Sequence, residues 1–204
     1  QIEAEFKAIM QMIKTMYDVF GLKWRARLSF RDESDKYLGD PELWNKAQTT
    51  IENVAKELGL DYFIGLGEAA FYGPKIDIMA TDAIGREWQL ATEQLDFVQP
   101  ERFDLEYTAE DGTKQRPVMI HKALLGSRER FMSVYIEHTA GSFPTWLAPV
   151  QVLLAPVSGE KHAPGAEELA TKWRALGMRV EVDAANETIG KKVRNAAAMK
   201  VPYI

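Results

Sequence analysis

The chain has 204 residues, of which 46% are hydrophobic and 27% are charged, and its formal net charge is −5. This balance is typical of a folded globular protein and argues against a disordered chain. The absence of cysteine excludes disulfides and thiolate metal sites within these residues. The negative net charge argues against indiscriminate nucleic-acid binding. No apolar run is long enough to span a bilayer. Because cysteine is absent, a cytoplasmic location is expected.

The first elements follow from hydrophobic spacing. Residues 1–20 carry apolar side chains three and four positions apart, which predicts one amphipathic helix. Residues 23–30 alternate and predict a strand, Pro41 begins a second helix that ends near Gly59, and residues 61–65 predict a short strand. Neither end of the chain has the signals of a domain boundary, so we expect a piece of a longer protein.

Two antiparallel hairpins are expected in the middle of the chain. Residues 75–80 and 87–97 flank one turn, and residues 102–109 and 115–120 flank the turn EDGT. A helix is predicted to follow from about residue 121 to about residue 138. Together these elements predict an α+β body built on an antiparallel sheet.

A different pattern follows a Pro- and Gly-rich linker at residues 141–149. Alternating strands and helices are predicted at 150–156, 163–176, 179–183, 188–199 and 201–204. This order predicts an α/β unit of the βαβ type with a parallel sheet. We therefore expect two domains, residues 1–148 and residues 149–204. The second carries eight Lys or Arg against six Asp or Glu, a net of +2 that permits contact with a polyanion.

Five motifs in register carry a resemblance to a known family. They are GEAAFYGPK at 67–75, ATEQLDF at 91–97, PVMIHKALLGSRERF at 117–131, FPTWLAPVQV at 143–152 and NETIGKKVRNAAAMKVPYI at 186–204. Together they resemble threonyl-tRNA synthetase, a class II aminoacyl-tRNA synthetase, over essentially the whole chain. The resemblance implies the C-terminal part of an α+β antiparallel-sheet catalytic domain of class II synthetase type, followed by a truncated α/β anticodon-binding domain.

The resemblance also implies an activity for the full-length protein. A threonine–tRNA ligase activates threonine with Mg²⁺ and ATP and transfers it to the 3′ end of tRNA(Thr), and such enzymes are expected to be homodimers. The fragment is expected to be inactive by itself. The alternative is a non-catalytic, synthetase-like module for tRNA binding or regulation, and the residues upstream of residue 1 would discriminate between the two.

Arg130 is the first candidate site residue. The predicted helix places Arg130 on one face with Ala123, Ser127 and Val134, at spacings of four, three and four. Composition alone favours an arginine paired with a surface carboxylate. By resemblance, Arg130 lies over the adenine of ATP and acts in catalysis, with Ser127 beside it in the ATP site.

A second group of candidates lies on the first predicted hairpin and the turn before it. By resemblance, Tyr72 and Gln94 bind threonine, Lys75 is catalytic through a phosphate of the adenylate, and Gln89 and Thr92 bind ATP. Strict alternation places Thr92 and Gln94 on one face and Gln89 on the other, so Gln89 can join them only through a bulge. The alternative for Tyr72 is an aromatic side chain that only packs, and the alternative for Lys75 is a lysine exposed to solvent.

His121 and Glu93 complete the reading of the first domain. A lone histidine is usually structural. The resemblance makes His121 one of three ligands of a Zn²⁺ ion that binds threonine, with a cysteine and a histidine expected upstream. Glu93 replaces an apolar residue of the family and is expected on the face opposite Thr92 and Gln94.

The second domain has candidates for the contact with tRNA. Asn186 precedes the predicted helix at 188–199 and could simply cap it. By resemblance Asn186 and Arg194 contact the anticodon, and Lys191 and Lys192 add positive charge for RNA phosphates. A solvated basic helix face is the alternative.

Overall fold

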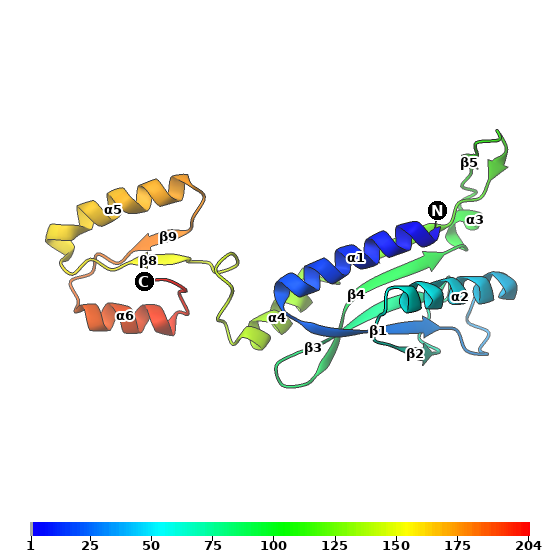
Figure 1. Cartoon of the computed structure of the whole chain (residues 1–204), viewed down its shortest axis with the longest axis horizontal. Coiled ribbons are helices and arrows are strands. Elements are labelled where there is room, and N and C mark those ends of the chain that lie inside the picture. Colours follow the sequence, from blue (N-terminus) through cyan, green and yellow to red (C-terminus); the bar gives the residue numbers. More distant parts are fainter. Residues whose placement is uncertain (1) are drawn as a thin grey trace. The chain divides into compact units, whose positions relative to one another are not determined.

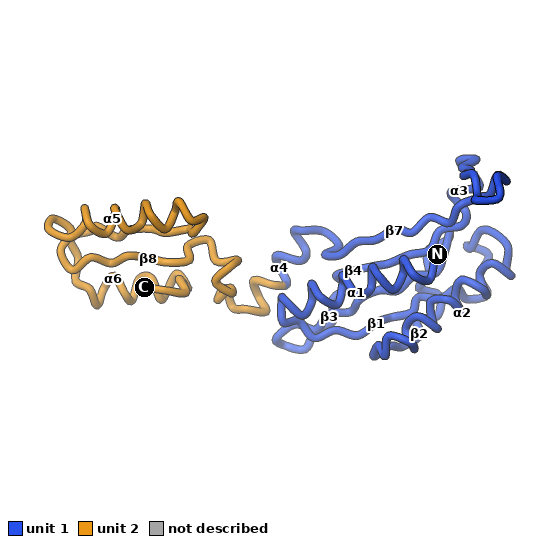
Figure 2. The backbone as a smooth tube through the Cα atoms, turned by 45° about the horizontal axis from the view of Figure 1, so that its top comes forward, with its two compact units in different colours: residues 1–134 blue, residues 135–204 orange. Residues whose placement is uncertain are grey.

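The computed structural model describes residues 2–204 (Figure 1). The chain forms two compact units, residues 1–134 and residues 135–204, which Figure 2 colours separately. The expected domain boundary after residue 148 stays a prediction. No helix of the described residues is both long enough and apolar enough to cross a bilayer.

The helices and strands have the following bounds. The helices are α1 (Ile2–Phe20), α2 (Pro41–Glu57), α3 (Gln99–Arg102), α4 (Arg128–Thr139), α5 (Gly159–Ala175) and α6 (Ile189–Ala198). The strands are β1 (Lys23–Phe30), β2 (Tyr62–Leu66), β3 (Lys75–Thr81), β4 (Glu87–Asp96), β5 (Tyr107–Thr108), β6 (Lys114–Gln115), β7 (Met119–Ala123), β8 (Val152–Leu154) and β9 (Val180–Val182). The expected start of the first helix at Gln1 lies outside the described residues.

The first unit is built on a five-stranded sheet with the order β2-β1-β3-β4-β7. The pairs β1–β3, β3–β4 and β4–β7 are antiparallel, and β3–β4 is the hairpin predicted from the sequence, but β1 and β2 are parallel. The antiparallel sheet predicted from the sequence is therefore confirmed, with β1–β2 as a parallel exception. The reason is that α2 connects β1 to β2 and returns the chain to the same end of the sheet, as a crossover helix does.

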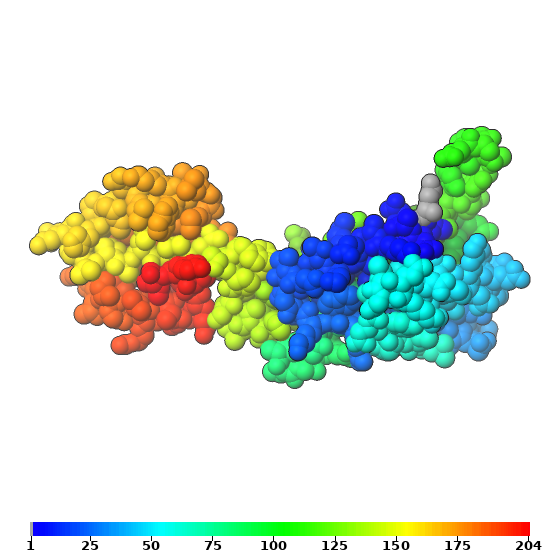
Figure 3. Space-filling model, viewed as in Figure 1, coloured from blue at the N-terminus to red at the C-terminus, as the bar shows by residue number. Residues whose placement is uncertain are grey.

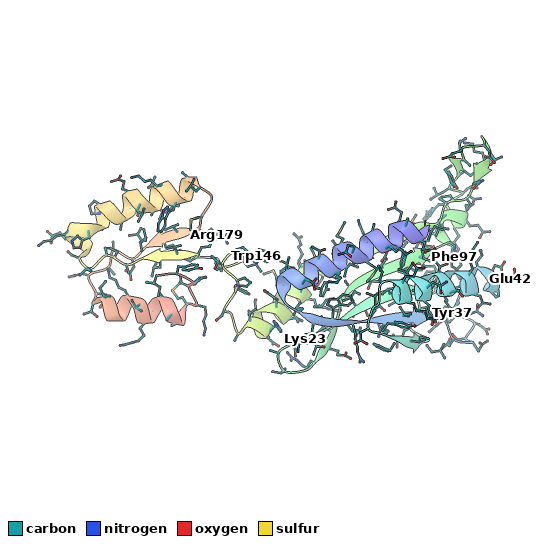
Figure 4. The ribbon with its side chains drawn as sticks, viewed as in Figure 1. Lys23, Tyr37, Glu42, Phe97, Trp146 and Arg179 are labelled. Atoms are coloured by element: carbon teal, nitrogen blue, oxygen red, sulfur yellow. The ribbon has the colours of Figure 1, made fainter. Side chains whose placement is uncertain are left out.

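Helices α1 and α2 lie side by side over one face of this sheet (Figures 1 and 2). The buried side chains of α1 are Phe6, Met10, Ile13 and Tyr17, which recur at helical spacing. Asp40 caps α2 by accepting a hydrogen bond from the Glu42 amide, and Pro41 occupies its first turn. The ring of Trp44 on α2 packs between the rings of Tyr37 and Phe97. Figure 4 labels Tyr37 and Phe97. One face of the sheet is thus an apolar core, and its other face is left for polar side chains.

Two predictions about residues 102–138 were wrong. The expected hairpin around the turn EDGT is present, but its strands are only the short pair β5–β6, which projects from the first unit (Figures 1 and 3). The expected first strand does not begin at Arg102, because Arg102 ends the helical turn α3. The helix expected from His121 begins at Arg128, because residues 119–123 form β7 and pair with β4. Pairing with a distant strand decided this segment over its local apolar pattern.

The second unit has a small parallel sheet with helices α5 and α6. Strands β8 and β9 are parallel, and their core consists of Val152, Ala170 and Val180. Arg179 donates hydrogen bonds to the carbonyl oxygens of Trp146 and Ala148; Figure 4 labels Trp146 and Arg179. Helix α5 begins four residues before the predicted start, after the cap Ser158. The strand expected at 201–204 is a single bridge between Tyr203 and Val152.

Candidate functional site

Polar side chains form two rows on the face of the sheet opposite α1 and α2. Strand pairing aligns Ser29, Lys75, Gln94 and His121 in one row. It aligns Arg27, Asp77 and Thr92 in the next, which ends at the apolar Ala123 on β7. Directly opposed residues on neighbouring strands have Cβ atoms roughly 5 Å apart, so each row is a set of touching side chains. Four residues predicted from the sequence, Lys75, Thr92, Gln94 and His121, are therefore brought together.

Asp77 is the centre of the second row and is fully buried. Its Oδ2 accepts hydrogen bonds from the Nη2 of Arg27 at 2.9 Å, the Oγ of Ser29 at 2.7 Å and the Nζ of Lys75 at 2.6 Å. Its Oδ1 accepts from the Nε2 of Gln89 at 2.6 Å and the Oγ1 of Thr92 at 2.8 Å. One carboxylate thus connects three of the predicted site residues.

Gln89 joins this face through an irregularity in β4. The pairing of β3 with β4 shifts register between Ile78 and Met79, so that Ile78 opposes Ala91 and Met79 opposes Gln89. Leu90 is left without an opposite residue, as in a β-bulge. The Nε2 of Gln89 consequently lies 3.0 Å from the Oγ1 of Thr92. The sequence analysis required such a bulge if Gln89 was to share the face of Thr92, and the strand contains it.

Tyr72 and Gln94 meet beside the first row. The hydroxyl of Tyr72 lies 3.1 Å from the Oε1 of Gln94, whose Nε2 donates to the carbonyl oxygen of Gly73 at 3.3 Å. A Cβ atom added to Gly73 would lie 1.7 Å from the carbonyl oxygen of Leu95. The turn before β3 therefore packs backbone against backbone, which holds the Tyr72 ring over the sheet.

His121 lies at the end of the first row with a buried carboxylate beside it. Its Nε2 is 2.9 Å from the Oδ2 of Asp96, and the side chain of Asp96 has no exposed surface. The ring of Tyr72 packs edge-on against the imidazole, with centroids 5.8 Å apart. Within residues 2–204, no group of three or more His, Cys, Asp or Glu side chains is placed to hold a metal ion.

Arg130 lies at the start of α4, next to Gln89. Its Nη1 is 3.5 Å from the Gln89 carbonyl oxygen, and its side chain is exposed. The expected helical face was wrong for Ala123, which lies in β7, and Ser127 precedes the helix instead of lying within it. Ser127 accepts a hydrogen bond from the Arg130 amide at 3.0 Å and so caps the helix that presents the guanidinium.

Glu93 lies on the opposite face, as expected, but it is an unusual core residue. The side chain is fully buried, and neither carboxylate oxygen has a hydrogen-bond partner among the described residues. Burial raises the pKa of Glu93 to about 9, although the ammonium of Lys122, directly opposite on β7, acts to lower it. Glu93 is therefore protonated at neutral pH.

In the second unit, Asn186 and Arg194 are both exposed, on the loop after β9 and on α6 respectively. Lys191 is exposed and forms an ion pair with Glu187. Lys192 is 1% exposed, and its Nζ donates to the carbonyl oxygens of Pro156 and Asp183. The expectation that Lys192 contacts RNA phosphates was therefore wrong, because its ammonium is used inside the fold.

The sequence analysis missed Arg27, Ser29, Asp77 and Asp96. A signal for them was present, because polar residues two positions apart in otherwise apolar strands share a face. Arg27 with Ser29, Lys75 with Asp77, and Gln94 with Asp96 are such pairs.

Comparison with known proteins agrees with the resemblance that the sequence motifs indicated for the two parts of the chain. Residues 1–139 match the family tRNA synthetase class II core domain (G, H, P, S and T), and residues 151–204 match the anticodon binding domain. The chain is 52% identical to a threonine–tRNA ligase of Thermosynechococcus vestitus and 48% identical to one of Thermotoga maritima. All of this chain is covered in both cases, but only 34% and 31% of those proteins, so the chain spans about a third of their length.

A solved structure extends this likeness to the fold. The RNA binding domain of threonyl-tRNA synthetase from Cryptosporidium parvum is 35% identical, with a TM-score of 0.93, and the match covers 100% of this chain and 52% of that one. The resemblance to threonyl-tRNA synthetase is thus confirmed. The chain belongs to the class II tRNA synthetase core domain family, and an anticodon-binding domain follows the core.

Proposed function

We propose that the whole protein containing this chain is a threonine–tRNA ligase. It forms threonyl-adenylate and pyrophosphate from threonine and ATP with Mg²⁺, and then transfers threonine to the 3′ end of tRNA(Thr). The proposal includes a homodimer in the cytoplasm. The relatives named above support the reaction class, and the two polar rows on the sheet support the location of the chemistry.

The observation that carries the proposal is the group of donors around Asp77 with Arg130 beside it. Lys75, Gln89 and Thr92 share one buried carboxylate, and the guanidinium of Arg130 lies at the Gln89 carbonyl oxygen. This arrangement offers a planar cation for an adenine ring and an ammonium for a phosphate. Positioned donors of this kind stabilise the charge that develops at the α-phosphate during adenylate formation.

The threonine pocket is proposed at Tyr72, Gln94 and His121, which adjoin one another at the end of the first row. The hydrogen bond of His121 uses Nε2, which leaves Nδ1 as the nitrogen for a metal ion, and a carboxylate on the other ring nitrogen is the usual companion of a zinc-bound histidine. His121 thus fits a Zn²⁺ ligand, with two further ligands expected outside this chain. When bound, Zn²⁺ would supply a Lewis acid for the amino and hydroxyl groups of threonine.

The second domain, with the boundary that we place after residue 148, is proposed to bind the anticodon. Asn186 is exposed in the loop at the carboxyl end of β9, where ligands of parallel sheets usually bind. Arg194 on α6 adds a charge for the RNA backbone.

The test is amino-acid-dependent exchange of pyrophosphate into ATP by the full-length protein. We expect exchange with threonine, with valine and proline far less effective. If none of the amino acids supports pyrophosphate exchange, the non-catalytic module is favoured. A preference for an amino acid other than threonine would assign the protein to a different synthetase.

A further inference from the structure

We propose that Asp77 is the positioning residue of the nucleotide site: it sets the places of Lys75, Gln89 and Thr92, and Arg27 balances its charge. This inference rests on the proposed function. It assigns a role to Asp77 and Arg27, which lie outside the five family motifs. The evidence is the set of five hydrogen bonds to one fully buried carboxylate.

The number of these bonds indicates what Asp77 does. An ionised carboxylate offers about four lone-pair positions, and five donors occupy them here. Asp77 therefore has no position left to bind Mg²⁺ or to accept a proton from a substrate. A saturated, buried carboxylate holds its neighbours in place, and this distinguishes it from a catalytic residue.

The charges around Asp77 explain why the group is tolerated and what it favours. Arg27 and Lys75 both contact Oδ2, at 2.9 and 2.6 Å, so two cations surround one anion. Glu68, whose side chain is 54% exposed, lies 3.5 Å from Arg27 and forms an ion pair with it at the rim of the cluster. The two cations therefore balance two carboxylates, and the cluster holds the ammonium of Lys75 in place without adding net charge to the site face.

Asp77 also orients the amide of Gln89. The Nε2 of Gln89 donates to Oδ1 of Asp77 and to Thr92, and the Oε1 accepts from Arg27 at 2.9 Å. The bulge at Leu90 brings Gln89 to this face, and the carboxylate then fixes the direction of its amide. Removing the charge of Asp77 leaves Lys75 and Arg27 close together without an anion between them, so both are expected to move.

The test is Asp77→Asn in the full-length protein, measured by threonine-dependent pyrophosphate exchange. At metal sites, loss of a residue that orients a ligand costs roughly 10- to 100-fold in activity, and we expect a loss of the same order here. We expect kcat/KM for ATP to fall by about that factor, mainly through a raised KM, and Asp77→Glu, which keeps the charge, to recover part of the loss. A parent-like KM for ATP in Asp77→Asn would overturn the proposal.

A matched control is Asp82→Asn, because Asp82 is a buried aspartate on the same hairpin whose partners, Arg86 and Trp88, lie outside the site. It should lower thermal stability without raising the KM for ATP. A double-mutant cycle separates positioning from a general loss of structure. Because Asp77 acts partly through Thr92, Asp77→Asn with Thr92→Val should lose little more than Asp77→Asn alone, whereas additive losses would overturn the proposal.

Two outcomes keep this inference separate from the proposed function. If the parent shows no threonine-dependent exchange, the function fails first. If the parent is active and Asp77→Asn does not fold, Asp77→Glu decides. Shifting the carboxylate by one methylene should raise the KM for ATP about threefold to tenfold, on the lower side of the loss known for such supporting partners. A parent-like value in that variant would also overturn the role of Asp77.

Discussion

The Nε2 of His121 lies 2.9 Å from the Oδ2 of Asp96, although 25 positions separate the two residues in the sequence. The other oxygen of Asp96 accepts hydrogen bonds from the amides of Val98 and Gln99. The carboxylate is therefore fixed by backbone on one side, and it fixes the imidazole on the other.

The first prediction concerns this pair. In the full-length protein, His121→Ala should lower zinc content and abolish threonine activation with only a modest loss of stability, of about 1 kcal/mol, because the partly exposed ring fills no core but Oδ2 of Asp96 loses a partner. Asp96→Asn should weaken zinc binding roughly 10- to 100-fold by releasing the ring. Metal analysis and a melting curve measure both effects, with the exposed His162→Ala as control. Parent-like zinc in His121→Ala, together with a large loss of stability, would show a structural histidine instead.

Arg130→Ala should impair adenylate formation and leave anticodon binding intact. Removing a charged donor from a reacting site typically costs about 2–4 kcal/mol of transition-state stabilisation. Pyrophosphate exchange measures this loss directly. Arg128→Ala is the matched control, because Arg128 is an exposed arginine in the same first turn of α4. Equal rates in the two variants would remove Arg130 from the site.

Gly73→Ala tests the close packing of the turn before β3. The added methyl group would lie 1.7 Å from the carbonyl oxygen of Leu95, so the turn must move away from β4. We expect a loss of stability of about 1–3 kcal/mol or more, and a weaker affinity for threonine because Tyr72 moves with the turn. Gly165→Ala has open space and a helical position in α5, so it should stabilise by about 0.5–1 kcal/mol. An unchanged melting temperature in Gly73→Ala would contradict the packing.

Glu93→Leu should stabilise the protein, and more so at high pH. The pKa of Glu93 rises from 4.5 to about 9 on folding, so the folded state keeps a proton that the unfolded state releases above pH 4.5. The parent therefore loses stability as the pH rises from 4.5 to 9, and the variant does not. Removing an unpaired buried carboxyl group should contribute about 1–3 kcal/mol. Denaturant unfolding at pH 5 and pH 8.5 should give a larger difference at the higher pH, and a constant difference would show that Glu93 does not titrate in this range.

Two basic residues of α6 should behave differently. Arg194→Ala should weaken tRNA binding and reduce the slope of log K against log salt by about one unit, as loss of one phosphate contact does. Lys192→Met should leave the slope unchanged and lower stability by about 1–3 kcal/mol, because it leaves the carbonyl groups of Pro156 and Asp183 unpaired. Binding titrations at several salt concentrations separate the two. A reduced slope in Lys192→Met would mean that its ammonium reaches RNA.

Local pattern predicted much of the fold in this protein. Residues 2–20 form a helix and residues 23–30 form a strand because apolar spacing marks the face that each element buries. Alternation predicted Thr92 and Gln94 on one face and Glu93 on the other. It also implied that Gln89 can share the face of Thr92 and Gln94 only through a bulge. Family motifs, in turn, named Tyr72, Lys75, His121 and Arg130 without any knowledge of their distances.

Tertiary structure decided what local pattern leaves open. Residues 119–123 suit a helix or a strand, and only pairing with β4 makes them a strand and sets His121 opposite Gln94. The role of Asp77 depends on donors from β1, β3 and β4 that converge when the sheet forms. Lys192 shows the same principle in the second unit. A lysine in a basic helix is expected at the surface, but two carbonyl groups from distant loops hold its ammonium inside, and such contacts exist only after the chain has folded.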